Sequence, residues 1–482
     1  MGRHEPRLGT VPQTPIGNVT VGSSPPMDSE QRDHQTDRPA GPIRKARLGL
    51  IVAGSLITGL GVSLALVIGP FGGAQEHVIM GMALLGWAFG WALLAALSTR
   101  WTDQPQRWAA VAAALMALAG ASLLMFKPDA NAFNALGWIW PPGLIALALW
   151  MTMQARRHLR SLTRPLVLYP VFAALVIAGI AGSYETIQEQ VDRSSTAMQG
   201  RLVDVGGRSL YIHCTGSGGP TVVLISGLAE ASTYWGGWIA PAVAHKTTVC
   251  VYDRAGQGWS DPPASPQDGV AVATDLHTLL ARAQIPSPYV VVGHSTGGAY
   301  ARIFAARYPD QVAGMVMLDS QPNEVFTGVP GFPSFYNIIR PASALFPSLA
   351  RLSVFRLINQ LSPHILPPQT RGEEIAVTST ANLNRIQRDE FAELPMTLKE
   401  AAGLASIGSR PLIIVTAGKG AQAGWLPLQV KMAGLSTNSD HRILPDTDHP
   451  GLIDDRIGAA QASQAILDVV GSVESGMPLS KG

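Results

Sequence analysis

The stretch Val292–Gly298, which reads VGHSTGG, decides the fold. It follows an apolar run and precedes a segment with helical spacing, so a strand is predicted to turn sharply into a helix here. The glycines two residues before and after Ser295 let the neighbouring backbones approach. The turn would present the Ser295 hydroxyl at the carboxyl edge of a sheet, in front of a helix N-terminus that favours negative charge. Ser295 is therefore the candidate nucleophile, and an idle serine in a Gly-rich turn is the alternative.

Strands alternate with helices on both sides of this turn. The predicted strands are Arg201–Val205, Ser209–His213, Thr221–Ile225, Thr247–Tyr252, Tyr289–Val292, Val312–Leu318, Pro411–Val415 and Arg442–Leu444. The first two are joined by Gly206-Gly207, which indicates a hairpin. The predicted helices are Val270–Arg282, Ala299–Arg307 and Ala459–Val470. Continuous apolar strands between helices indicate an α/β domain, residues 200–472, whose mostly parallel sheet is covered on both faces.

A serine hydroxyl needs a base to take its proton. In a fold with this kind of elbow the base is a histidine that follows the last strand. His449 lies between the last predicted strand and the final helix, in the segment 445–451. We therefore expect His449 to be the base, although a histidine in an ordinary surface loop is the alternative.

The acid that orients the histidine is usually found in the loop after the strand Pro411–Val415. That loop, residues 416–424, contains no carboxylate. Asp319 ends the preceding predicted strand, and a carboxylate at that carboxyl end can also reach the histidine. Asp319 is the expected acid, with a structural hydrogen-bonding role as the alternative. Three aspartates close to His449 in the sequence are rivals: Asp440, Asp446 and Asp448.

An oxyanion hole requires two backbone N–H groups directed at the developing negative charge. The expected donors are the amide of Thr296, which follows the nucleophile, and that of Leu228, in the loop 226–230. Glu230 and Tyr234 are expected to line the pocket. The pair Asp253-Arg254 is expected to be structural.

These residues resemble the α/β-hydrolase-fold serine hydrolases of the esterase and peptidase-like group. The resemblance covers residues 200–472, and the motifs that carry it are Ser226-Gly227, the run 253–260 (DRAGQGWS), the run 293–298 and Asp448-His449. It implies acyl transfer to water, in which Ser295 attacks, His449 moves the proton and Asp319 orients the imidazole. A carboxylic ester is the expected substrate, with peptides or amides as alternatives, and neither cofactor nor metal ion is expected. Epoxide hydrolases and haloalkane dehalogenases of the same superfamily use an aspartate nucleophile, and Ser295 argues against both.

Residues 321–408 separate two predicted core strands and are too long for an ordinary connection. Apolar residues recur at helical spacing in Ala344–Leu361, and Ile386–Ile407 is a second helical region. The resemblance implies a cap over Ser295 that excludes water and shapes the pocket. Its apolar helices suggest an apolar small-molecule acyl substrate, whereas an insertion without function is the alternative.

The apolar residues concentrate in the first 184 positions, and charged residues make up only 14% of the chain, against roughly 25% in an average protein. Five runs of 18 to 21 residues contain no Asp, Glu, Lys or Arg: Leu48–Ile68, Val78–Leu97, Trp108–Phe126, Leu136–Met153 and Pro165–Tyr184. Each is long enough to cross a bilayer as a helix. We therefore expect an all-α bundle of five transmembrane helices over residues 44–184, although Pro141-Pro142 interrupts the fourth run. Buried core helices are the alternative.

Basic residues on alternate loops predict the orientation of these spans. They are Arg44, Lys45, Arg47, Arg100, Arg107, Arg156, Arg157, Arg160 and Arg164. The positive-inside rule places the N-terminus in the cytoplasm and everything after Tyr184 outside it. Residues 1–43 are expected to be a disordered tail, 185–199 a linker and 473–482 a flexible terminus.

The predicted function is a membrane-anchored serine hydrolase with an extracytoplasmic catalytic domain. A hydrolase-fold binding or sensing module on a membrane anchor is the alternative. A transporter is disfavoured because the five runs contain no ionisable Asp, Glu, Lys or Arg. The net charge of +2 gives no support for nucleic-acid binding, and the sequence points to the bilayer but to no protein partner. Cys214 stands at the end of the predicted strand Ser209–His213, and Cys250 lies in Thr247–Tyr252. The resemblance implies that these two strands are neighbours, so a disulfide and two free thiols both remain open.

Overall fold

The computed structural model describes residues 42–69, 74–159, 168–362 and 365–480. Residues from Ile43 onward form one compact unit. The predicted tail, residues 1–43, lies outside the described residues except for its last two, which already belong to helix α1 (Pro42–Ile68).

An eight-stranded sheet organises the second half of the chain, in the order β1-β2-β4-β3-β5-β6-β7-β8. The strands are β1 (Arg201–Asp204), β2 (Ser209–Thr215), β3 (Thr221–Ile225), β4 (Val249–Tyr252), β5 (Tyr289–His294), β6 (Val312–Leu318), β7 (Leu412–Ala417) and β8 (Ser439–Leu444). β2 pairs antiparallel with β1 and with β4, and all the other pairs are parallel. This confirms the predicted α/β-hydrolase fold, including its N-terminal hairpin.

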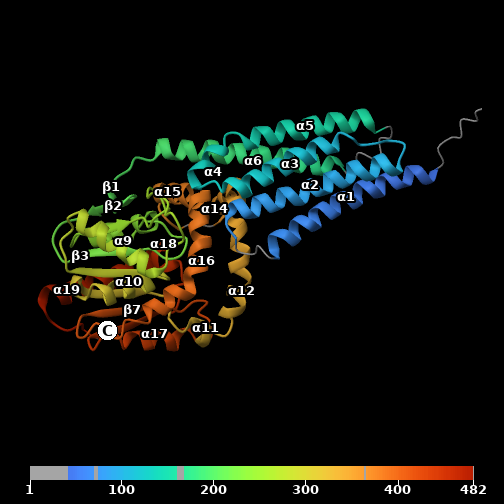
Figure 1. The fold of residues 1–482 in the computed structure, drawn as a ribbon. Helices are drawn as coiled ribbons and strands as arrows, with labels where there is room; N and C mark the ends of the chain where they lie inside the picture. Colours follow the sequence, from blue (N-terminus) through green and yellow to red (C-terminus); the bar gives the residue numbers. More distant parts are fainter. Residues whose placement is uncertain (1–41, 70–73, 160–167, 363–364, 481–482) are drawn as a thin grey trace, which may run out of the picture. The chain divides into compact units, whose positions relative to one another are not determined.

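Helices cover both faces of this sheet, and each covered face has its own apolar core (Figure 1). One face carries α9 (Gly269–Arg282), α10 (Gly297–Arg307) and α17 (Trp425–Ala433), and the other carries α8 (Ile239–Ala244), α18 (Gly451–Asp454) and α19 (Arg456–Ser475). Every residue of β3 and β5 is buried, which explains why these strands are continuous apolar runs rather than alternating ones. Helix α19 runs to Ser475, so residues 473–475 are helical rather than part of a flexible terminus.

Cys214 and Cys250 stand opposite each other on β2 and β4 and form a disulfide. The structure thus selects one of the two alternatives that the sequence left open.

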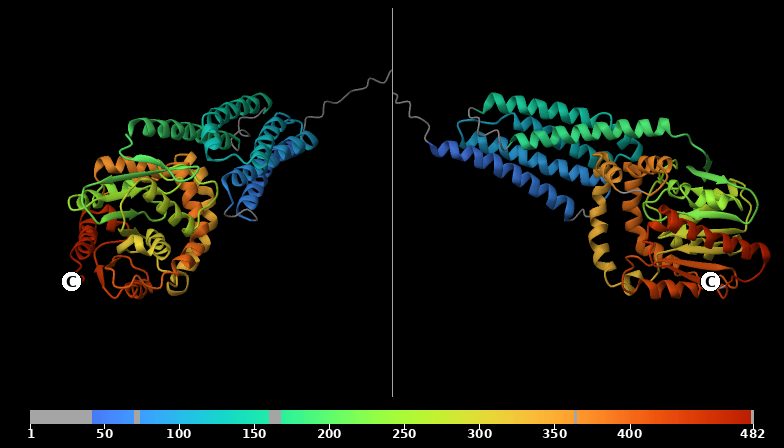
Figure 2. Two further views of the ribbon diagram at one scale, coloured as in Figure 1. Left: turned by 60° about the vertical axis from the view of Figure 1, so that its left-hand side comes forward. Right: turned by 180° about the vertical axis from the view of Figure 1, so that it is seen from behind.

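The N-terminal helices include four with the length and composition of membrane spans among the described residues: α1 over Leu48–Ile68, α2 (Glu76–Trp101), α3 (Ala109–Phe126) and α6 (Leu168–Ser195). Figure 2 shows these helices running beside one another. The predicted fourth run is not one straight helix, because α4 (Ala130–Leu136) and α5 (Trp140–His158) meet at an angle of 43°. The described part of the chain therefore has four helices that are long and apolar enough to cross a membrane, or five such elements if the bent pair counts as one.

The prolines of the fourth run begin a helix rather than interrupt one. Pro141 and Pro142 lie in the first turn of α5, where a missing N–H costs no hydrogen bond. The predicted linker 185–199 is also largely helical, since α6 continues without a break to Ser195. Polar side chains there, including Glu185, end the apolar pattern but not the helix.

The segment between β6 and β7 forms a helical cap. It contains α11 (Val325–Gly328), α12 (Phe332–Ala342), η3 (Ser343–Leu345), α13 (Phe346–Arg351), α14 (Val354–Leu361), α15 (Pro368–Thr378) and α16 (Ala381–Ala401). The predicted helical region Ala344–Leu361 is divided in three, and Ser353, with a φ of 58°, separates α13 from α14.

Candidate active site

Ser295 sits in a strained turn between β5 and α10, with a φ of 54° that non-glycine residues rarely adopt. A Cβ added to Gly293 would lie 2.5 Å from the Gly297 carbonyl carbon, and one added to Gly297 would lie 2.2 Å from the Ile225 oxygen. Both positions therefore require glycine. The Ser295 N–H donates to the Leu318 carbonyl at 3.1 Å, which fixes the turn against β6.

His449 and Asp319, far apart in the sequence, are in contact. The distance from His449 Nδ1 to Asp319 Oδ2 is 2.6 Å. Asp319 is buried directly after β6, and its φ of 41° is a second strained backbone at a strand end. Because a carboxylate only accepts, Nδ1 carries the hydrogen, and the neutral imidazole has Nε2 as its acceptor.

The second oxygen of Asp319 is held by a residue that sequence reasoning missed. Asp319 Oδ1 accepts a hydrogen bond from Trp425 Nε1 at 2.7 Å and lies 3.3 Å from the Ala417 amide. Ala417 ends β7 and Trp425 begins α17, so the two residues that border the loop after β7 hold the carboxylate of Asp319, and the loop itself contains no carboxylate. Of the rival aspartates, Asp440 pairs with Arg442 at 2.8 Å, and Asp448 pairs with Lys419 at 3.2 Å.

His294, which the sequence assigned only to the turn, links the elbow to the His449 loop. Its Nδ1 lies 2.7 Å from Glu230 Oε1, and its Nε2 lies 3.1 Å from the His449 carbonyl oxygen. Both partners are acceptors, so both ring nitrogens must carry hydrogen and the ring is an imidazolium. The rings of His294 and His449 have centroids 4.6 Å apart. His449 is thus fixed beside the residue that precedes Ser295.

Charge stabilises this buried pair. Burial lowers the pKa of His294, but the Glu230 carboxylate outweighs it and raises that pKa above its ordinary value. Burial likewise raises the pKa of Glu230, but the His294 charge outweighs it and lowers that pKa. Glu230 therefore supports the elbow from within. Tyr234 lies in the short helix α7 (Thr233–Gly236), and its Oη donates to Glu374 Oε1 of α15 at 2.8 Å, which connects α7 to the cap.

A buried arginine holds the loop that follows β3. Arg254 donates to the carbonyls of Ser226 at 2.5 Å and Gly227 at 2.7 Å, and it pairs with Glu390 of α16 at 2.6 Å. The other oxygen of Glu390 accepts from the Ala229 amide at 3.1 Å. The sequence predicts a structural role for Arg254, and this arginine holds the loop that is expected to supply an oxyanion donor. Glu390 of the cap assists it, and no motif in the sequence marks that residue.

This network selects one amide of the loop. The Gly227 amide donates to Glu230 Oε2 at 2.6 Å, and the Ala229 amide is taken by Glu390. Among the described residues, neither the Leu228 amide between them nor the Thr296 amide has a hydrogen-bond partner. A Cβ added to Gly227 would lie 2.9 Å from the Ser295 Cβ, so the loop touches Ser295. The two expected oxyanion donors thus carry no hydrogen bond within the described part of the chain, and their role stays a prediction.

In the part of the chain that the structure describes, no group of three or more His, Cys, Asp or Glu side chains could hold a metal ion.

Comparison with known proteins agrees with the architecture. Residues 220–351 match the family model of the alpha/beta hydrolase fold. The chain is 45% identical over 83 residues to an uncharacterised protein of Schizosaccharomyces pombe. The match covers 17% of this chain and 15% of that protein. It is 38% identical over 77 residues to an uncharacterised vacuolar membrane protein of Saccharomyces cerevisiae, covering 16% of this chain and 12% of that protein. The chain thus spans less than a fifth of the length of either relative.

A solved structure with a similar fold is that of the Cif epoxide hydrolase from Acinetobacter nosocomialis. Its TM-score is 0.50 at 16% sequence identity, and the match covers 59% of this chain and 96% of that one. The similarity is one of fold.

Proposed function

We propose that this chain, which has the α/β-hydrolase fold, is a membrane-anchored serine hydrolase that cleaves an ester or a similar acyl bond. The observation that carries the proposal is the 2.6 Å hydrogen bond between His449 Nδ1 and Asp319, beside the strained elbow that presents Ser295. Strain at a non-glycine residue is costly and is retained mainly where function requires it. This favours a working hydrolase over a binding module with an idle serine.

The proposed reaction has two acyl-transfer steps. His449 Nε2 takes the proton of Ser295 Oγ while Oγ attacks the carbonyl carbon of the substrate, and the oxyanion accepts hydrogen bonds from the Leu228 and Thr296 amides. The imidazolium then gives its proton to the leaving alcohol or amine as the acyl–oxygen or acyl–nitrogen bond breaks. Water attacks the acyl-enzyme with His449 again as base, which releases the acid and restores Ser295.

Membrane anchorage and an extracytoplasmic hydrolase domain are part of the proposal. The apolar helices support the anchorage, and Arg100, Arg156 and Arg157 lie in the last turns of α2 and α5, the ends expected in the cytoplasm. The Cys214–Cys250 disulfide supports an oxidising compartment for the rest of the chain.

Covalent labelling by a fluorophosphonate tests the chemistry. The full-length protein in detergent is expected to become labelled at Ser295, and Ser295→Ala should not be labelled. The turnover of a short-chain aryl ester by Ser295→Ala should be at least roughly 1,000-fold lower than that of the wild type. Ser217→Ala, at an exposed serine, serves as the matched control and should behave as the wild type. Folded wild type that fails to label would contradict the proposal.

A membrane-impermeant fluorophosphonate tests the sidedness separately. Cells whose outer envelope has been opened should label without permeabilisation of the inner membrane. Labelling that requires permeabilisation would place the hydrolase domain in the cytoplasm and leave the chemistry intact.

A further inference from the structure

Two cap helices expose apolar side chains that neither the core nor the candidate site uses. On α12 these are Phe335 and Ile338, exposed by 51% and 71%, and on α14 they include Leu357, Ile358 and Leu361, the last exposed by 75%. Within these two fully described helices, no exposed position carries a charged residue. We call these five side chains the cap apolar face. Such a concentration on a protein surface marks a contact with another apolar phase.

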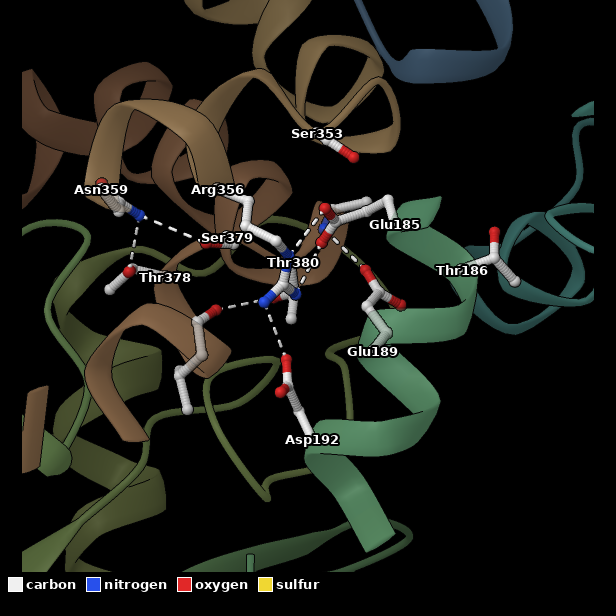
Figure 3. Close-up of polar contacts among 12 residues, drawn as sticks. Glu185, Thr186, Glu189, Asp192, Ser353, Arg356, Asn359, Thr378, Ser379 and Thr380 are labelled. Carbon is white, nitrogen blue, oxygen red and sulfur yellow. Dashed lines mark hydrogen bonds and ion pairs between the residues drawn. The ribbon is translucent and has the colours of Figure 1, made fainter. Parts of the chain in front are cut away.

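The start of α14 lies at the depth of the apolar part of helix α6. Ser353 Oγ donates to the Ala181 carbonyl at 2.9 Å, and Ala181 belongs to the uncharged run that ends at Tyr184. One turn further along α6, Arg356 of α14 donates to both carboxylate oxygens of Glu185, at 2.9 and 2.8 Å. Figure 3 shows Arg356 also reaching Asp192, at 2.9 Å. The cap therefore contacts α6 where its hydrocarbon-compatible segment ends.

A second set of contacts joins the cap to α1 and α2, at the helix ends on the same side as the contacted end of α6. Ala344 of η3 is buried against Val67 near the end of α1 and Ile79 in the first turn of α2. Glu76, the first residue of α2, accepts from Arg351 at 2.5 Å and from Arg385 at 2.7 Å. The cap thus meets three span ends that the charge pattern places on the same side of the membrane. The exposed apolar helices α12 and α14 flank these contacts in the chain.

We propose that the cap apolar face is embedded in the headgroup–acyl boundary of the extracytoplasmic leaflet. An uncharged apolar helix face beside the ends of membrane spans buries its side chains in the lipid. The bilayer is favoured over a second copy of the chain because the cap contacts the ends of α1, α2 and the apolar part of α6, and the ends of α1 and of that part of α6 themselves expose apolar side chains, Ile68 by 65% and Ile180 by 56%. This inference rests on the membrane anchorage of the proposed function.

Fluorescence quenching in nanodiscs tests the contact on the full-length protein. Single cysteines replace Ile338, Leu361, Leu118 on α3 and Met477, and each is labelled with a small fluorophore. Leu118 and Met477 are exposed to the same extent, 66%, so they are matched references for lipid and water. Met477 lies at the amino edge of the sheet, where the nearby Leu479 amide binds Asn438 just before β8.

We expect lipids that carry a shallow nitroxide to quench the labels at 338 and 361, and iodide to quench them at least about threefold less than the label at 477. If iodide quenches 338 and 361 as strongly as 477 while Leu118 stays lipid-quenched, the inference is wrong and the anchorage stands. The label at 118 lies midway along α3 and is tested with a nitroxide deep on the acyl chain; if that nitroxide fails to quench it, the anchorage itself fails. Labels at 338 and 361 that are shielded from both quenchers would mean a protein partner and would also overturn the inference.

Discussion

The candidate active site and the contact between the cap and the membrane helices both depend on buried charge pairs, but the pairs act on different parts of the chain. In the site, Arg254 and His294 each pair with a carboxylate and also donate to backbone carbonyls, those of the loop 226–227 and of His449. At the membrane helices, Arg356 directs its hydrogen bonds to the side chain of Glu185. The first arrangement fixes the backbone beside Ser295 and His449, whereas the second joins two helices. Removal of a charge from a pair in the site should therefore reduce turnover. Removal of a charge at the helices should instead weaken the docking of the cap on them.

The largest effect is expected at Asp319. In Asp319→Asn the amide would donate to His449 and favour the wrong tautomer, so kcat for an aryl ester should fall about 10,000-fold while the fold persists. Trp425→Phe removes only one of the hydrogen bonds to Asp319 and should cost about tenfold. If Asp319→Asn kept kcat within tenfold of the wild type, the assignment of the acid would be wrong.

A smaller effect, on docking alone, is expected at Glu185. Glu185→Gln leaves the buried Arg356 without its main counter-charge, at a cost of about 3 kcal/mol, so the open population of the cap should rise about 100-fold. Thermolysin cleavage within residues 332–378 in detergent, mapped by mass spectrometry, measures that population.

The exposed pair Arg282–Asp204 provides the matched control, because both side chains are at least half exposed. Arg282→Gln should leave the cleavage rate within about twofold of the wild type. Cleavage of Glu185→Gln at the wild-type rate would show that the ion pair does not hold the cap.

The smallest effect is a pH-dependent one at Glu230. The raised pKa of His294 means that the pair contributes fully below the ordinary histidine value of 6.5 and loses its contribution as the pH rises through the raised pKa. The lowered pKa of Glu230 means that its contribution is present above 4.5 and is lost in stronger acid. Glu230→Gln should therefore reduce the free energy of unfolding by about 2 kcal/mol between these values.

Urea unfolding of the two proteins across pH 4 to 9 measures this difference. The difference in the free energy of unfolding between wild type and Glu230→Gln, called the gap below, should decrease towards alkaline pH. A gap that widened there would mean that His294 is neutral and that the imidazolium assignment is wrong.

The sequence was sufficient for features that local patterns encode. The strands β3 and β6 have the predicted bounds, because each is a continuous apolar run between turn residues. Ser295, Asp319 and His449 could be singled out since each directly follows or closely follows a strand, and the ends of parallel strands meet at one edge. Their catalytic roles stay predictions.

Contacts that depend on which cap helix covers which loop could not be predicted in the same way. Glu390 lies in a long helix with many charged residues, and nothing in its spacing distinguishes the one that reaches the Ala229 amide. Trp425 carries no such signal either, because a donor to the carboxylate can be any N–H group near the end of β7, whereas a carboxylate there would stand out in the sequence. Residues 185–195 were assigned to a linker because polarity ends the span pattern, although helix α6 continues through them.

Helix α16 connects the two regions compared above. Arg385 binds Glu76 at the start of α2, and Glu390, five residues later, holds the loop beside Ser295. At a rise of 1.5 Å per residue these side chains stem from points about 7.5 Å apart on one rigid rod. We expect a change of bilayer thickness to shift α2. Because α16 is rigid between Arg385 and Glu390, this shift should also move the amides around Leu228. Turnover should therefore vary with the acyl-chain length of the host lipid.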